Sequence, residues 1–292
     1  MSEFREKNPE KISRKTAEDF VISRKRKLYK FAKFTEAENT FNLASWTDFR
    51  ETFSDLSRNK KLVAEIGAGS AIFLTELAEK NPEKIFVAVD KKSDRLWQGA
   101  KIAKEKSLAN IFYVWVDVSR LGQVFAKSSV DEIWLTFSDP FAHDDYQEKR
   151  GEFSRKFHAD LRFSDDKNYA ENLAKYKKDV AEFDADSRKN FAKYLRKNGH
   201  GRLTNEKFLE QYARILTEDG ALNFKTDNAP LFEWSLENFA KSGWKTEMIS
   251  RNLHAEKGAD FAEAQIMTSY EARYTNELLP INFAKMLPPR KK

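Results

Sequence analysis

Glu65-Ile66-Gly67-Ala68-Gly69-Ser70-Ala71 stands at the end of a short apolar run, Leu62 to Ile66, and leads into an amphipathic stretch. Two glycines at a strand-to-helix turn let the backbone approach a ligand closely, because neither carries a Cβ. A dinucleotide-binding turn would have a third glycine three positions after Gly69, but that residue is Ile72. The Gly-Lys-Ser or Gly-Lys-Thr ending of a phosphate loop is also absent. The turn therefore indicates a nucleoside site of another kind.

Outward from this turn, short apolar runs alternate with longer amphipathic stretches, which is typical of βαβ units. The expected strands are Leu62 to Ile66, Ile85 to Val89, Ile111 to Val116, Glu132 to Phe137, Ala221 to Thr226 and Trp244 to Ile249. Helical spacing of apolar residues follows the first two strands, at Phe73, Leu77 and Ala78 and at Leu96, Ala100 and Ala103. The pattern predicts a Rossmann-like α/β fold with a doubly wound, mostly parallel sheet.

A segment from about Gly151 to Arg196 interrupts this rhythm, because it contains no strand-like run and is dense in charge. Its apolar residues recur at steps of four and three, which predicts one buried helix face formed by Tyr169, Leu173, Tyr176, Val180 and Phe183. We therefore expect a basic N-terminal extension over residues 1–50, a main domain over 51–150 and 197–292, and a helical insert over 151–196.

The charge balance suits a polyanionic partner, since 52 Lys and Arg against 46 Asp and Glu give a net charge of +6. The densest basic stretch, Ser23 to Phe34, mixes phosphate-seeking charge with rings that can stack on bases. A solvated helix face with core aromatics explains that stretch equally well.

Cysteine is absent, which excludes disulfides, Cys-bound zinc and thiol nucleophiles. The four His are scattered without metal-ligand spacing, so no metal is expected. No apolar run reaches about 18 residues and no secretory leader is visible, so we expect no membrane span and a cytoplasmic location.

Acidic residues follow four successive expected strands, at Glu65, Asp90, Asp117 and Asp139. Glu65 would repel a pyrophosphate but suits the ammonium or hydroxyl groups of a methionyl nucleoside. Asp90 could accept hydrogen bonds from ribose hydroxyls, and Asp117 from an adenine amine. Any single acid could instead be a helix cap or a turn residue. Together they lie where open α/β sheets bind ligands, and they predict an S-adenosylmethionine site.

Further motifs occur in order along the chain. They are Glu65 to Phe73, Val89-Asp90, Ser129 to Ile133, Phe137 to Phe141, Arg202 to Thr204, Lys225-Thr226-Asp227 and Thr268 to Arg273. From about Arg24 to Asn282, apart from the insert, the sequence resembles the bacterial single-chain tRNA (guanine-N7)-methyltransferase family. The last two motifs are distinctive of that family, whereas many methyltransferases share the glycine turn.

The resemblance implies methyl transfer from S-adenosyl-L-methionine to N7 of the variable-loop guanine 46 of tRNA, with no obligatory protein partner. It implies that the donor is bound by Glu65, Gly67, Gly69, Asp90, Asp117 and Asp139, with Asp139 also catalytic. The implied substrate-binding residues are His143, Asp227, Thr268, Tyr270, Glu271 and Arg273. Guanine N7 has a free lone pair and needs no strong base, so positioning and electrostatics suffice.

The sequence departs from the family pattern around the glycine turn and around Asp139. Ala71 replaces the usual third glycine, and Ser138 and Phe141 replace Pro and Trp. His143 stands where the family has a substrate-side Lys, and a neutral His can donate one hydrogen bond without the permanent charge. Basic residues resume after the insert, and we hypothesise that they contact tRNA instead, at Arg196, Lys197, His200 and Arg202. A stabilising cover or a surface for a protein contact explains the insert equally well.

Two other functions remain open on these residues. A methyltransferase for a small molecule or a protein would make the basic stretch incidental and the Lys225-Thr226-Asp227 match a coincidence. A non-catalytic RNA-binding descendant would explain the altered residues around Asp139. The intact donor acids argue against that descendant.

Overall fold

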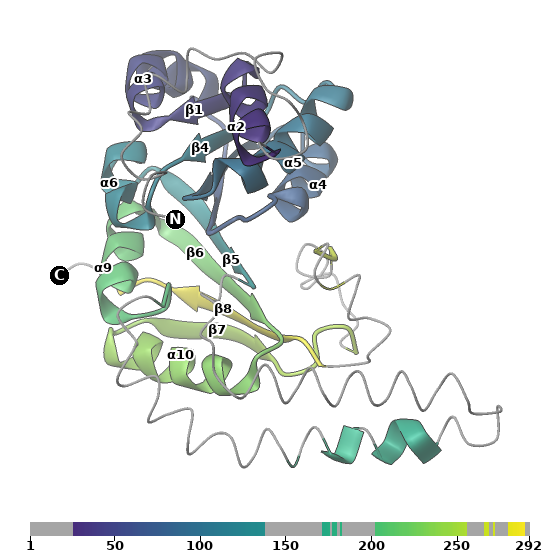
Figure 1. Cartoon of the computed structure of the whole chain (residues 1–292). Helices are drawn as coiled ribbons and strands as arrows, with labels where there is room; N and C mark the ends of the chain where they lie inside the picture. Colours follow the sequence, from purple (N-terminus) through teal and green to yellow (C-terminus); the bar gives the residue numbers. More distant parts are fainter. Residues whose placement is uncertain are drawn as a thin grey trace, which may run out of the picture.

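A twisted eight-stranded sheet with the order β1-β4-β3-β2-β5-β6-β8-β7 forms the centre of the computed structural model (Figure 1). The structure describes residues 26–137, 171–175, 177–179, 182, 202–255, 266–268, 271 and 280–289. The strands are β1 Thr40–Asn42, β2 Leu62–Ile66, β3 Ile85–Asp90, β4 Ile111–Trp115, β5 Val130–Thr136, β6 Leu216–Thr226, β7 Lys245–Ser250 and β8 Asn282–Leu287. Neighbouring strands are parallel except at β8, which is antiparallel to β6 and β7.

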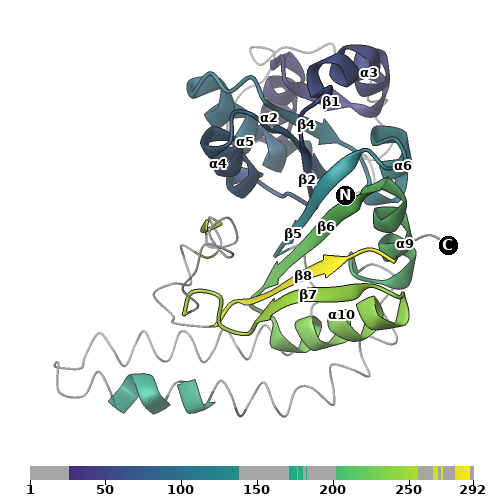
Figure 2. The same ribbon diagram turned by 180° about the vertical axis from the view of Figure 1, so that it is seen from behind.

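Helices cover both faces of the sheet (Figures 1 and 2). One face carries α2 Arg26–Glu36, α4 Ile72–Lys80 and α5 Ser93–Glu105. The other carries α3 Leu43–Ser57, α6 Leu121–Val124, which follows the 3-10 turn η2 Val118–Arg120, α9 Glu206–Ile215 and α10 Ala229–Lys241. Successive residues of β2 enter opposite cores, Val63 with α4 and Ala64 with the α3 side. Burial on both faces explains the unbroken apolar runs, and the expected doubly wound, mostly parallel sheet is confirmed.

Each expected strand has a counterpart, but the structure adds two strands and extends one. β6 begins at Leu216 rather than Ala221, because Leu216 pairs with Val130 before a register shift on β5. β1 has only three residues, too few for a periodic signal. β8 carries Lys285 within an otherwise buried run, which hides its strand character in the sequence.

Residues 26–57 are part of the sheet domain. β1 pairs in parallel with β4, and the indole of Trp46 on α3 is completely buried. The Trp46 indole N–H donates to the Val124 carbonyl over 3.0 Å. The boundary expected at residue 50 falls inside α3, so residues 26–50 fold with the sheet instead of standing apart from it.

Of the expected insert over residues 151–196, the structure describes only 171–175, 177–179 and 182, all helical. Lys178 and Glu182 form an exposed ion pair of 3.8 Å on this helix. Most of the apolar stripe, with Tyr169, Tyr176, Val180 and Phe183, lies outside the described residues. In the described ranges, no helix has the length and apolar character needed to cross a membrane.

Candidate active site

The glycine turn between β2 and α4 is held against β3 by its own backbone. The N–H groups of Gly67 and Ala68 donate to the Val89 carbonyl over 2.8 and 3.0 Å. Gly67 and Gly69 have φ of 74° and 56°, values that favour glycine. A Cβ added at Gly69 would meet no atom within 4 Å, so the turn faces open space there. Both glycines thus have backbone conformations that favour glycine, and the turn has open space at Gly69.

Ala71 is the substituted third glycine, and the structure shows what the substitution entails. Its φ of 53° is left-handed, and it stands at the N-cap of α4 without a side-chain cap bond. A non-glycine residue in this region costs roughly 1 kcal/mol. Ala71 thus adopts a left-handed conformation that glycine would adopt without this cost.

Glu65 is a buried carboxylate with one oxygen in use. Its side chain is 1 % exposed, and Oε1 accepts a hydrogen bond from the Thr136 hydroxyl. Oε2 has no hydrogen-bond partner among the described residues. Burial raises the pKa of Glu65 to about 8, helped by nearby Asp90 and opposed by Thr136 and Lys225. A buried polar atom without a partner is costly, so this oxygen is available to a ligand, as a donor while Glu65 is protonated and as an acceptor once it is ionised.

Asp90 stands at the end of β3 and both shapes the turn and faces the same end of the sheet. Its Oδ2 accepts from the Gly69 N–H over 2.9 Å, and its Oδ1 accepts from the Lys92 N–H over 2.8 Å. Burial raises its pKa, against the effect of these two bonds. Each carboxylate oxygen has a second lone pair, so the carboxylate can still accept ribose hydroxyls.

Asp117 lies after β4 and is exposed. It caps η2 through Oδ1, which accepts from the Ser119 N–H over 2.9 Å and from the Ser119 hydroxyl over 2.7 Å. These bonds lower its pKa. Asp117 is thus a helix cap, the alternative that the sequence allowed for each of the four acids. It also stands at the end of a strand, where a ligand group is expected.

Phe137 is the last described residue before Ser138 and Asp139. Phe137 follows β5 with φ of 47°, a backbone conformation that is rare for a bulky residue. Its N–H donates to the Lys225 carbonyl over 2.9 Å. Four of the predicted site residues lie outside the described ranges, namely Asp139, His143, Tyr270 and Arg273.

The two distinctive motifs of the C-terminal half meet in a buried ion pair. Lys225 and Glu271 are 0 % and 1 % exposed, with Nζ 2.9 Å from Oε1. Nε2 of His254 lies 3.0 Å from the same oxygen. Burial lowers the pKa of the Lys225 ammonium. Burial would raise that of Glu271, but the bonds from His254 and Lys225 outweigh it and its pKa lies below the usual range.

Thr268 and Glu271 also bond to each other. The Thr268 N–H donates to Oε2 of Glu271 over 2.7 Å, and the Glu271 N–H donates to the Thr268 hydroxyl over 3.0 Å. This is the reciprocal pattern of a capping box, and the spacing Thr-x-x-Glu signals it in the sequence. Sequence reasoning assigned both residues to guanine and missed this structural use.

Asp227 is half-buried and follows the end of β6. The turn that presents it is fixed by Thr226, whose hydroxyl accepts from the Asn228 N–H over 3.1 Å. The Thr226 carbonyl accepts from the Asn282 side chain over 3.3 Å. Asp227 therefore stands at the same end of the sheet as Glu65 and Asp90, on a parallel strand.

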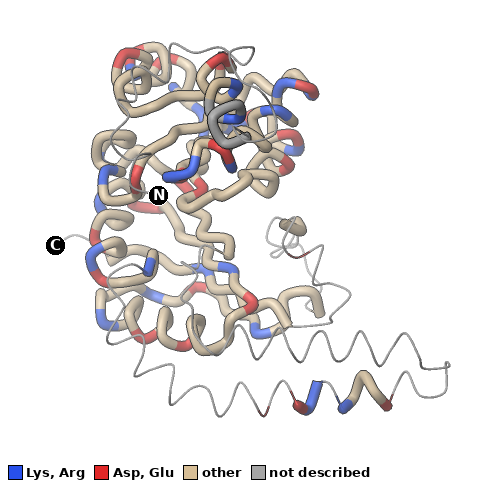
Figure 3. Tube along the Cα trace, viewed as in Figure 1, with Lys and Arg blue, Asp and Glu red and all other residues tan. Residues whose placement is uncertain are grey.

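Arg202 does not fit the hypothesis of a tRNA contact after the insert. Its side chain is 4 % exposed, so it is not available to a phosphate. Arg196, Lys197 and His200 lie outside the described residues. Lys and Arg are interspersed with Asp and Glu along most of the described chain (Figure 3). The helix α2 differs, because it carries Arg26, Lys27, Lys30 and Lys33 before its one acid, Glu36.

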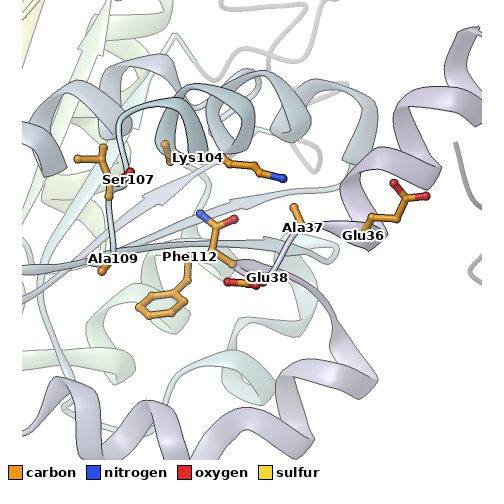
Figure 4. Close-up of a pocket in the computed structure, with 10 residues that line it drawn as sticks. Glu36, Ala37, Glu38, Lys104, Ser107, Ala109 and Phe112 are labelled. Atoms are coloured by element: carbon orange, nitrogen blue, oxygen red, sulfur yellow. The ribbon is translucent and has the colours of Figure 1, made fainter.

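A cavity of about 460 Å³ lies at the opposite end of the sheet (Figure 4). It is bounded by the end of α2, the end of α5 and the starts of β1 and β4. Its rim has both Glu36 and Glu38 and the basic Lys104. Because Glu65 and Asp90 stand at the carboxyl ends of the strands, this cavity is no part of their site.

A Rossmann-like methyltransferase is the class of protein that this sheet, the glycine turn and the acids at its edge define. The sequence matches the family described as putative methyltransferase over residues 59–194 and 190–283. It is 33 % identical to a tRNA (guanine-N(7)-)-methyltransferase of Mycoplasmopsis pulmonis, over 77 % of this chain and 84 % of the relative. The chain belongs to this family of tRNA (guanine-N7)-methyltransferases.

A second relative and a solved structure are also similar to this chain. A protein of the same name from Lachnoclostridium phytofermentans is 28 % identical over 77 % of this chain and 79 % of its own length. Among solved structures, the 16S rRNA methyltransferase KamB is 15 % identical with a TM-score of 0.49, over 82 % of this chain and 94 % of that one. Within the described ranges, no three His, Asp or Glu residues gather as a metal site.

Proposed function

We propose that this chain transfers a methyl group from S-adenosyl-L-methionine to N7 of guanine 46 in the variable loop of tRNA. The observation that carries the donor side is the buried oxygen of Glu65 without a hydrogen-bond partner, on the strand that leads into the open turn at Gly69. The names of the relatives support tRNA as the acceptor. We further propose that the protein acts in the cytoplasm without an obligatory protein partner.

The donor-side residues have complementary tasks. S-adenosylmethionine supplies, when bound, a methyl group activated on a sulfonium. With a pKa of about 8, Glu65 is mostly protonated in the free protein at neutral pH; it ionises beside the ammonium of the donor and then accepts a hydrogen bond from it. Asp90 accepts from the ribose. Asp117 accepts from the adenine amine, while Gly67 and Gly69 let the backbone come close.

On the acceptor side, Asp227 accepts hydrogen bonds from N1 and the amino group of guanine, which together form a donor pair. Thr268, Tyr270, Arg273 and His143 contact the nucleotide from the neighbouring segments. Glu271 already accepts bonds from Lys225, from the Thr268 N–H and at His254, so we assign it a supporting role under Thr268. This revises its expected direct contact with guanine.

Asp139 is the proposed catalytic residue. N7 attacks with its own lone pair, so no proton has to be removed first. Guanine gains positive charge while the sulfonium loses it, and a carboxylate near both stabilises the charge as it moves. The altered neighbours Ser138 and Phe141 leave this electrostatic role intact, because it depends on the carboxylate alone.

The experiment is methyl transfer from labelled donor to unmodified tRNA, followed by chemical cleavage at 7-methylguanosine. We expect cleavage at position 46 and a loss of at least 100-fold in rate for Asp139→Asn. Asp219→Asn is the matched control, since Asp219 is an exposed acid near the opposite end of β6. Label without this cleavage would refute N7 as the target. Donor binding without any transfer to tRNA would favour another substrate, and no donor binding would favour a non-catalytic descendant.

A further inference from the structure

Lys225 lies on the same sheet face as the donor acid Glu65. The register pairs Glu65 with Trp134 and Thr136 with Lys225 on adjacent parallel strands. Trp134 and Thr136 are two residues apart, so both side chains leave β5 on one face. The Thr136 hydroxyl also donates to Glu65. Thr136 therefore lies between Glu65 on β2 and Lys225 on β6. A completely buried ammonium therefore stands two strands away from the acid that is proposed to hold the donor.

The ammonium of Lys225 is directed at the segment that carries Thr268. It donates to the Ile266 carbonyl over 3.0 Å and lies 2.9 Å from Oε1 of Glu271. Both bonds reach residues flanking Thr268, and Glu271 holds Thr268 through the capping box. The ammonium also lies 5.5 Å from the ring centre of Phe73 on α4, the helix that follows the glycine turn.

The backbone of Lys225 also holds Phe137, the last described residue before Asp139 in the sequence. The Lys225 carbonyl accepts the Phe137 N–H over 2.9 Å, at the point where φ of Phe137 becomes positive. Asp139 follows two positions later in the sequence. One residue thus contacts the donor side, the approach to the catalytic acid and the acceptor segment.

We infer that Lys225 is a positioning residue of the methyl transfer, which fixes the Thr268 segment relative to Glu65 and keeps a positive charge between two buried carboxylates. The inference rests on the proposed function. Stability alone does not account for the arrangement, because a buried ion pair is often no more stable than a well-packed apolar pair. Lys225 bonds both the Ile266 carbonyl and the Glu271 carboxylate, so these bonds tie the Thr268 segment to β6.

The charge of Lys225 predicts a signature in the pH dependence of donor binding. The groups facing Glu65 are Thr136 on β5, Asp90 on β3, Lys225 on β6 and the Leu74 backbone on α4. Lys225 lowers the pKa of Glu65, so removing its charge raises that pKa further. Donor affinity would then recover only at a higher pH than in the wild type.

The test compares Lys225→Met with wild type by equilibrium binding of S-adenosylmethionine between pH 6 and pH 9.5 and by tRNA methylation kinetics. We expect donor affinity at least tenfold weaker at pH 7, with a gap that narrows toward pH 9.5, and a raised KM for tRNA. Lys285→Met is the matched control, because Lys285 on neighbouring β8 pairs with Glu247 at 2.8 Å in an exposed position. It should leave both measurements unchanged.

The double variant Lys225→Met/Glu271→Gln covers the case in which the single variant does not fold, because it leaves no unpaired buried charge. An upward shift of its pH profile for donor binding supports the positioning role, and a wild-type profile overturns it. If the wild type methylates tRNA and Lys225→Met folds but keeps the wild-type pH profile for donor binding, the positioning role of Lys225 is rejected. The proposed function then still stands. Absence of methyl transfer to tRNA by the wild type would instead reject the proposed function.

Discussion

The Thr268 N–H donates to Oε2 of Glu271 while the Glu271 N–H donates back to the Thr268 hydroxyl. A motif that marks the family is therefore also a capping box, and its buried acid pairs with Lys225 of the other distinctive motif. The two motifs are far apart in the sequence and in contact in the fold. Their joint presence has a structural reason as well as the proposed role toward guanine.

Thr268→Val and Thr268→Ser separate those two roles. Valine has a similar shape but no hydroxyl, so it should lower the free energy of unfolding by about 1 kcal/mol, the usual value of an N-cap bond. Serine keeps the hydroxyl and should retain most of the stability. Urea denaturation measures this, and the KM for tRNA reports the contact with substrate. A valine variant as stable as the wild type would contradict the capping role.

Glu65→Gln should remove the pH dependence of stability that Glu65 causes. With a pKa of about 8, the folded chain retains a proton on Glu65 that the unfolded chain loses above pH 4.5. The free energy of unfolding therefore falls as pH rises from about 4.5 to about 8, by up to roughly 5 kcal/mol. Glutamine cannot ionise, so the variant should gain stability relative to the wild type over this window.

Urea titrations of both donor-free proteins at pH 5, 6.5 and 8 measure this effect. The variant should also bind S-adenosylmethionine at least tenfold more weakly at pH 8, because it lacks the carboxylate charge. A stability difference between the two proteins that stays constant with pH would show that Glu65 titrates normally.

Gly69→Ala should damage donor binding more than folding. The added Cβ meets no atom, so the cost to folding is the left-handed φ of 56°, about 1 kcal/mol. The same Cβ would occupy the open space in front of the turn, and we expect donor affinity to fall at least tenfold. Gly122→Ala is the control, since Gly122 is exposed on α6 with equal room and no positive φ. Calorimetric titration that finds equal affinity for both variants would place the donor elsewhere.

The central strands could be predicted from the sequence because β2 to β5 are buried on both faces and read as apolar runs. The expected ends of these two strands, β2 and β3, were then enough to locate Glu65 and Asp90 from the sequence alone. The bond between Lys225 and Glu271 could not be predicted in this way, because it exists only once β6 and the Thr268 segment have packed together. The one hint was a Lys inside a strand that is otherwise buried.

The edge of the sheet was beyond prediction for a different physical reason. β1 takes its place from pairing with β4, a contact set by tertiary structure and not by local propensity. The aromatic residues around it do carry a signal, since Phe41 and Phe49 stack at 4.6 Å and Phe112 of β4 lies 5.6 Å from Phe49. Sequence reasoning did not use these residues, because the partner ring lies on a distant strand.

Trp46→Ala tests whether this edge folds with the rest of the domain. The indole is fully buried, packs on Phe53 at 4.7 Å between ring centres and donates to the Val124 carbonyl. Truncation of such a residue costs about 3–5 kcal/mol, and it should lower the midpoint of the single cooperative unfolding transition. Leu56→Ala on the same helix is the control, since Leu56 is 44 % exposed and should change stability by less than about 0.5 kcal/mol. If Trp46→Ala instead produced a separate early transition and left the main one in place, residues 26–57 would be an accessory unit and β1 would not be needed by the sheet.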